Sequence, residues 1–277
     1  MFAKLEKWQR NLIVLWLGCF IAGVGFSELA PFLSLYVEEL GNFNKGQLSL
    51  YSGVTYAITF LVVAIVSPLW GGRLADRKGR KLMLLRSSLG MAIIIGACGF
   101  VHTIWELLIL RFLEGLCAGY IPNASALIAA ESPRAKSGAA LGILTTGYVS
   151  GNLIGPVLGG FLAQVFSIRL TFVLTGFLLL IVFGLSLFFV HEDFVPASQK
   201  KKFPHHSFPL AQFKNPSAII VLLLSTMIIQ MGNNSITPII SLYVKELMHG
   251  VGPITIAAGI IAALPGVSTL LTAPATR

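Results

Sequence analysis

The chain has 277 residues, of which 55% are hydrophobic and only 11% are charged, and its formal net charge is +9. A mean hydropathy of +0.82, with the charges gathered between long apolar runs, excludes an ordinary water-soluble domain and is typical of a polytopic membrane protein. The runs are too long and too continuously apolar for the alternating strands of a barrel, so we expect an all-helical fold.

Eight apolar runs are long enough to cross a bilayer, which takes about 20 residues of helix. We predict the crossings near residues 11–37, 47–71, 82–101, 104–130, 137–165, 168–190, 217–243 and 254–276. The first run is much longer than the core of a signal peptide, so we expect an uncleaved first crossing. All three cysteines, Cys19, Cys98 and Cys117, fall inside these runs, which favours packing residues over disulfides.

The basic residues are distributed unevenly between the two sides of the predicted membrane. If the N-terminus is cytoplasmic, the cytoplasmic segments carry 16 Lys and Arg residues, the outer loops carry three, and Arg111 lies within a crossing. This bias is typical of the positive-inside rule. The positive charge therefore indicates orientation in a membrane, and no nucleic-acid partner is expected.

Three charged residues lie deep within predicted crossings: Glu28 in the first, and Arg111 and Glu114 in the fourth. A charge at membrane depth costs a few kcal/mol or more, so each of them needs a partner or an aqueous cavity. Counted from the outer ends of their helices at 1.5 Å per residue, Glu28 lies about 12 Å deep and Arg111 about 10 Å deep. Glu114 shares a helix face with Arg111 because three residues separate them.

The stretch SPLWGGRLADRKGRK, residues 67–81, places six charges in the nine positions from Arg73 to Lys81. Positive charge that merely sets topology is one explanation. A loop that latches one conformation is the other, which we favour because Asp76 can accept backbone N–H bonds and Gly79 permits a tight turn. The basic residues could pair with Asp76 or with lipid phosphate.

Small residues mark one face of the fifth crossing. Gly147, Gly151, Gly155 and Gly159 recur every four residues and form a ridge that another helix can approach closely. Pro156 adds a kink, because it cannot donate to its own helix. Ala258, Ala262 and Gly266 offer a complementary small face on the eighth crossing. We predict that these two helices meet, with ordinary membrane packing as the alternative.

Amide side chains could line a substrate cavity. The candidates are Asn123, Gln230, Asn233 and Asn234, although such amides can equally bond neighbouring helices. We expect His205 and His206 to lie in a solvated linker, and no metal site is predicted. The sequence contains neither GxxxxGK[ST] nor HExxH, which argues against ATP-driven transport and against a membrane enzyme.

An internal repeat divides the chain. APFLSLYVEEL at 30–40 and TPIISLYVKEL at 237–247 share seven of eleven residues at an offset of 207. Six crossings and a polar segment at 191–216 separate the copies, so we predict a six-helix bundle over 1–190, a cytoplasmic linker over 191–216 and two helices of a second bundle over 217–277. The second copy ends where its counterpart of the 67–81 loop should begin, which suggests a truncated protein; a natural eight-crossing protein is the alternative.

Three motifs resemble the major facilitator superfamily, whose members are built from two six-helix halves. The signature loop matches at Gly72, Leu74, Ala75, Asp76, Arg77, Gly79, Arg80 and Lys81. LLILRFLEGLCAG at 107–119 matches a second motif. The third is the drug-efflux antiporter motif of the fifth helix, matched by Gly142, Gly151, Gly155, Pro156, Gly159 and Gly160.

The resemblance implies proton-coupled efflux of multiple drugs by alternating access, with antibiotics such as fosfomycin, or bile-salt-like amphipaths, as first substrates to test. It implies a multi-pass protein of the bacterial inner membrane that confers antibiotic resistance, needs no cofactor beyond the proton gradient, and is monomeric at full length. Helices 1 and 4 are neighbours in that superfamily, so Glu28 is expected within reach of Arg111, where the pair and Glu114 could couple proton binding to transport. A metabolite symporter and a non-transporting fragment are the alternatives.

Overall fold

The computed structural model describes residues 6–68, 74–192 and 216–272. Every regular element in these ranges is helical, which confirms the predicted all-helical fold. The elements are α1 (Lys7–Glu28), η2 (Ala30–Phe32), α2 (Leu33–Glu39), α3 (Lys45–Ser67), α4 (Ala75–Lys78), α5 (Arg80–Cys98), α6 (Ile104–Cys117), α7 (Tyr120–Glu131), α8 (Ser137–Val165), α9 (Ile168–Phe189), α10 (Pro216–Ile236), η5 (Thr237–Ile239), α11 (Ile240–Leu247) and α12 (Ile254–Thr272).

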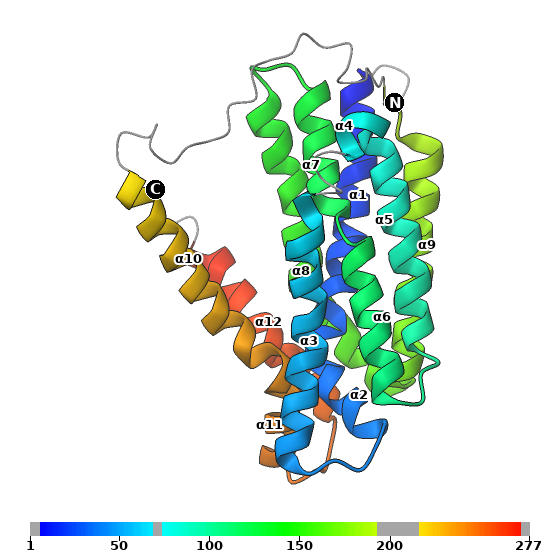
Figure 1. Ribbon diagram of the computed structural model, residues 1–277, viewed down its shortest axis with the longest axis vertical. Helices are drawn as coiled ribbons and strands as arrows, with labels where there is room; N and C mark the ends of the chain where they lie inside the picture. The colour runs from blue at the N-terminus through cyan, green and yellow to red at the C-terminus, as the bar shows by residue number, and fades with distance from the viewer. Residues whose placement is uncertain (1–5, 69–73, 193–215, 273–277) are drawn as a thin grey trace.

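The long helices from α1 to α9 run side by side in one bundle, and α10 leans away from it (Figure 1). We call proximal the end of the bundle that holds Lys7 and the connection between α7 and α8. The distal end is the opposite one, which holds α2, α11 and the connections that follow them.

Six helical segments of the described chain are long and apolar enough to cross a membrane. They are Lys7–Glu39, Lys45–Ser67, Arg80–Cys98, Ser137–Val165, Ile168–Phe189 and Ser217–Leu247. These six agree with predicted crossings. The remaining two predictions fall on shorter helices, because α6 and α7 divide the range 104–130 and the apolar part of α12 covers only Ile254–Ser268.

Proline interrupts the first crossing and its repeat in the same way. Pro31 lies in η2 and Pro238 in η5, so each crossing contains one 3₁₀ turn near its distal end. Proline has no N–H to donate to the preceding turn, and this loss breaks the regular α-helical ladder. The two copies of the repeat therefore share a backbone shape as well as a sequence.

The predicted single helix over 104–130 is wrong, since the chain breaks between α6 and α7. Gly119 has φ +126°, a conformation that a side chain at this position would strain. Three residues later, Pro122 has no N–H to offer to the carbonyl of Ala118. The guanidinium of Arg86, on α5, takes that role and donates to the carbonyl oxygens of Leu116 at 2.9 Å and Ala118 at 3.2 Å.

Helix α1 lies at the centre of the bundle, in contact with α7, α8 and α9. On the other side, α5 packs against α9 and α3 against α6. The second repeat joins this bundle mainly near the distal end, through η5 and α11 and through α12, which packs along α8. The side chains of α10 are largely exposed; Leu222, for example, is 67% exposed. The helices thus meet distally and separate towards the proximal end (Figure 1).

Candidate functional site

Glu28 ends α1 and is one of the few charged residues buried in the bundle. Its side chain is 1% exposed. The hydroxyl of Thr175, on α9, lies within hydrogen-bond distance of Oε1 of Glu28 and of the carbonyl of Thr171, and it can donate its single proton to either. Oε2 of Glu28 has no hydrogen-bond partner among the described residues. Glu28 also touches α8, because a Cβ placed on Gly159 would lie 2.8 Å from the Cβ of Glu28. The carboxylate therefore sits at the junction of α1, α8 and α9.

Arg111 pairs within its own helix. Its Nη1 lies 2.8 Å from Oε2 of Glu114; the Glu114 side chain is buried and that of Arg111 is 11% exposed. The ring of Phe172, on α9, lies 5.6 Å from the guanidinium carbon. The expected contact between Glu28 and Arg111 is therefore wrong. The reason is that α9 serves both groups: Phe172 covers the guanidinium, and Thr175, one helical turn later, binds the carboxylate.

The glycine ridge of α8 packs against α1, which corrects the predicted partner. A Cβ on Gly147 would lie 2.7 Å from the carbonyl oxygen of Trp16, and one on Gly155 would lie 2.8 Å from that of Val24. Gly151 likewise leaves no room for a Cβ beside Val24. The absence of side chains lets the two helices touch backbone to backbone.

The predicted meeting of α8 with α12 is confirmed, but through a different face of α8. A Cβ on Gly160 would lie 2.5 Å from the carbonyl oxygen of Thr255, and one on Gly266 would lie 2.6 Å from Leu153. The Thr255 hydroxyl donates to the carbonyl of Gly160 at 3.0 Å. Gly142 has open space around it, and the structure offers no packing reason for a glycine there.

The signature loop is only partly described. Gly72 lies outside the described residues, as does the side chain of Asp76. Gly79 has φ +92°, which agrees with the predicted tight turn. The backbone N–H groups of Arg80 and Lys81, the first of α5, donate to the two carboxylate oxygens of Glu192 at 2.9 and 2.7 Å.

Of the other loop residues, Arg77 is exposed and Lys81 is half-buried. The ammonium of Lys81 donates to the carbonyl of Leu187 on α9 at 2.9 Å. Glu192 lies three residues after the last residue of α9, so the segment that follows α9 holds the start of α5. Sequence reasoning missed Glu192, although an acidic pair after the sixth crossing was a visible signal.

At the distal end, equivalent positions of the two repeats touch each other. The hydroxyls of Ser34 and Ser241 are 2.9 Å apart, and the Lys245 ammonium lies 2.7 and 2.8 Å from the two oxygens of Glu38. Both pairs are separated by 207 residues, the offset of the sequence repeat. Residues that meet their own counterparts lie close to the axis relating two copies. We call these four residues the distal latch.

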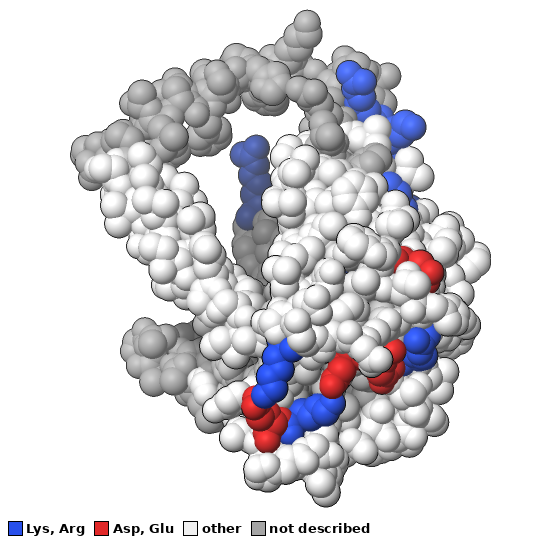
Figure 2. All heavy atoms as spheres, turned by 60° about the horizontal axis from the view of Figure 1, so that its bottom comes forward, with Lys and Arg blue, Asp and Glu red and all other residues white. Residues whose placement is uncertain are grey.

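The charges of the distal latch follow from this symmetry. Two identical charged residues facing each other across the axis would repel, and the repeat instead has Glu38 in one copy and Lys245 in the other. A second ion pair, between Lys45 and Glu246 at 2.9 Å, lies beside it and is more exposed. Figure 2 shows basic and acidic side chains alternating across the distal face. The charge reversal within the repeat was the signal that sequence reasoning overlooked.

A family model described as Major Facilitator Superfamily matches residues 15–277. The chain belongs to the major facilitator superfamily. It is 53% identical over 268 residues to the multidrug resistance protein MdtG of Salmonella dublin, a match that covers 97% of this chain and 66% of that protein. The MdtG of Salmonella paratyphi A is 52% identical with the same coverage. The chain thus spans about two thirds of the length of these curated relatives.

Solved structures share the superfamily fold. A bacterial homologue of the human lysosomal transporter Spinster, inward-facing and occupied, aligns with a TM-score of 0.70 at 17% identity, over 96% of this chain and 61% of that one. Its inward-facing, unoccupied form gives 0.67 at 18% identity, over 96% and 62%. At this identity the likeness shows the fold alone.

The amide residues predicted to line a substrate cavity differ from one another in their surroundings. Asn123 is 3% exposed, and its amide nitrogen donates to the carbonyl of Gly119 at the helix break, 2.7 Å away. Asn234 accepts from the Tyr56 hydroxyl of α3 at 3.2 Å and donates to the carbonyl of Gln230. Gln230 is exposed, and the side chain of Asn233 lies outside the described residues. Asn234 therefore connects the two repeats, whereas Asn123 stabilises a backbone turn.

Proposed function

We propose that this chain belongs to a proton-coupled multidrug exporter of the bacterial inner membrane that works by alternating access. Residues 1–190 form its first bundle, 191–216 a cytoplasmic linker and 217–277 the beginning of its second bundle. The 53% identity to MdtG, a protein named for multidrug resistance, supports the substrate class of small amphipathic molecules. The excess of basic residues on one side supports a cytoplasmic N-terminus.

The distal latch is the observation that carries this proposal. Alternating access requires the two halves to close one end of a central site while the other end stays open. Ser34 with Ser241 and Glu38 with Lys245 join the halves at the distal end, while α10 leans away from the bundle proximally (Figure 1). With the proximal end in the cytoplasm, this arrangement corresponds to an inward-facing state.

Glu28 is our candidate for the proton-binding group, with Arg111 and Glu114 as a neighbouring buried ion pair. A buried carboxylate that has one side-chain partner can exist charged or neutral, and protonation removes the cost of burying its charge. When ionised, Glu28 accepts from the Thr175 hydroxyl. When protonated, it can itself donate to that hydroxyl oxygen. Protonation would therefore change the contact between α1 and α9 without moving either helix far.

Export by everted membrane vesicles tests this function. The chain is expressed in cells that lack their own exporters, and drug-induced proton release is followed by a pH-sensitive dye. We expect Glu28→Gln to abolish proton release, Thr175→Val to shift its pH profile, and Glu106→Gln, which changes an exposed carboxylate, to have no effect.

Three outcomes would contradict the proposal. Unchanged pH-dependent export by Glu28→Gln would exclude that residue as the proton site. Uptake of a metabolite together with protons would favour a symporter. If the chain exports nothing while full-length MdtG does so in the same cells, the non-transporting fragment is the correct description of residues 1–277.

A further inference from the structure

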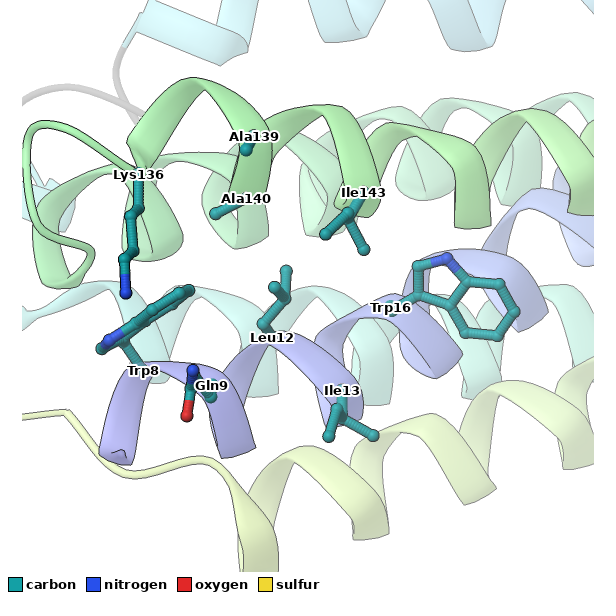
Figure 3. A pocket seen from close by; sticks show the side chains of 9 residues that line it. All are labelled: Trp8, Gln9, Leu12, Ile13, Trp16, Lys136, Ala139, Ala140 and Ile143. Carbon is teal, nitrogen blue, oxygen red and sulfur yellow. The ribbon is translucent and has the colours of Figure 1, made fainter. Parts of the chain in front are cut away.

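A groove of about 480 Å³ runs between α1 and α8 near the proximal end. Trp8, Leu12 and Trp16 border it on α1, Ala139 and Ile143 on α8, and Lys136 directly before α8 (Figure 3). Eight residues of helix separate the two tryptophans, which corresponds to about 12 Å along the groove. Its walls are apolar, and Lys136 lies at its proximal end near Trp8 (Figure 3).

The groove faces away from the space between the two repeats. Helix α12 of the second repeat packs on the face of α8 that holds Pro156 and Gly160. Ile143 precedes Pro156 by 13 residues, so it points about 140° away around the helix. Ile13 and Ile143 are 45% and 51% exposed. An exposed apolar face in a membrane-crossing segment meets lipid.

The two indole N–H groups and the Gln9 amide oxygen that border the groove already have partners. The Trp16 indole N–H donates to the Thr146 hydroxyl at 3.0 Å, and that of Trp8 donates to Glu6 at 2.5 Å. The amide oxygen of Gln9 accepts from the backbone N–H of Glu6. Lys136 is exposed, and no described residue bonds its ammonium. The groove is therefore an apolar slot that ends in one available positive charge.

We propose that this groove binds one anionic phospholipid, with an acyl chain along the slot and the headgroup phosphate on Lys136. An acyl chain needs no hydrogen-bond partner, whereas the heteroatoms of a drug would be left unpaired in the slot. A tryptophan at the level of the headgroups suits Trp8. The charged residues within two positions of Trp8 or Lys136 in the sequence are Glu6, Lys7, Arg10 and Arg134, and they leave an excess of positive charge. The leaflet follows from the proposed orientation, which would place the lipid on the cytoplasmic side.

Quenching of tryptophan fluorescence by brominated lipids tests the inference. The chain, with Trp70 and Trp105 replaced by Phe so that Trp8 and Trp16 remain, is placed in bilayers that contain brominated phosphatidylglycerol or brominated phosphatidylcholine. We expect phosphatidylglycerol to quench at the lower mole fraction. Lys136→Gln should lower that preference about fivefold, the size expected for one lysine at a lipid surface. Lys78→Gln, on an exposed lysine of α4, should preserve it.

A second variant tests the slot itself. Ala139→Trp fills the groove, and native mass spectrometry should find the retained phospholipid lost, while Ile93→Trp on another exposed face retains it. The inference is overturned if Lys136→Gln keeps the full preference or if the Ala139→Trp chain still carries its lipid. These measurements do not depend on transport. Lipid binding can therefore be tested even if the chain exports no drug.

Discussion

Reversing the charge of Glu38 tests how the distal latch holds the two repeats together. In Glu38→Lys, two ammonium groups would meet where the Lys245 ammonium now lies 2.7 and 2.8 Å from the two carboxylate oxygens. The side chains are 39% and 38% exposed, and exposed ion pairs contribute about 0.2–1 kcal/mol. The two-oxygen geometry favours the upper end of that range, and like-charge repulsion adds a similar amount. The distal-closed state should therefore lose roughly 2 kcal/mol, or about 30-fold in population.

The assay is the distance between spin labels at Asn42 and Val251, two exposed positions at the distal end, in a chain without its three cysteines. Glu38→Lys and Lys245→Glu should each populate a longer distance. The double exchange, Glu38→Lys with Lys245→Glu, should restore the short one. Because exposed charges are screened, the effect should shrink as salt is raised.

Glu246→Lys provides the matched control. It breaks the neighbouring ion pair with Lys45, whose side chains are 66% and 91% exposed, and it should shift the distance distribution far less. The reasoning is refuted if the double exchange behaves like the single variants, because the contact would then not depend on opposite charge. It is equally refuted if neither single variant changes the distance.

Three further predictions concern stability, measured as thermal unfolding in detergent. Gly151→Val should destabilise by about 1–3 kcal/mol through overpacking against α1, whereas Gly142→Val, in open space, should cost little; equal effects would exclude the backbone contact. Glu192→Ala should cost about 1 kcal/mol as a lost cap, and Glu192→Gln less. Arg86→Met should cost about 1–3 kcal/mol because the carbonyls between α6 and α7 lose their donor, and an unchanged midpoint would show that water replaces it.

The sequence predicted the membrane class, the helical fold and most crossing ranges, because apolar run length is a local property. It missed the break between α6 and α7, even though Gly119 and Pro122 are both visible in the sequence. The break persists because Arg86, 30 to 32 residues earlier in the chain, satisfies the carbonyls that it frees. Gly119 and Pro122 alone therefore did not determine the break, because it also requires the hydrogen bonds from Arg86.

The candidate site divides in the same way. The ion pair of Arg111 with Glu114 follows from three-residue spacing on one helix, so helical geometry was enough to expect it. The glycine spacing of α8 likewise predicted a close contact with another helix, but it did not identify that helix. Glycine spacing cannot decide whether α1 or α12 contacts the ridge. That choice depends on the tertiary packing of the bundle.

By itself, the sequence determined which segments repeat, which segments can cross a membrane, and which charged residues need a partner at membrane depth. Only the tertiary structure decided which groups pair. Helix α9 places Phe172 on Arg111 and Thr175 on Glu28, and the symmetry of the repeat brings Glu38 to Lys245. The physical reason is that helix periodicity is encoded within a few residues, whereas the partner of a buried charge is set by contacts between segments far apart in the chain.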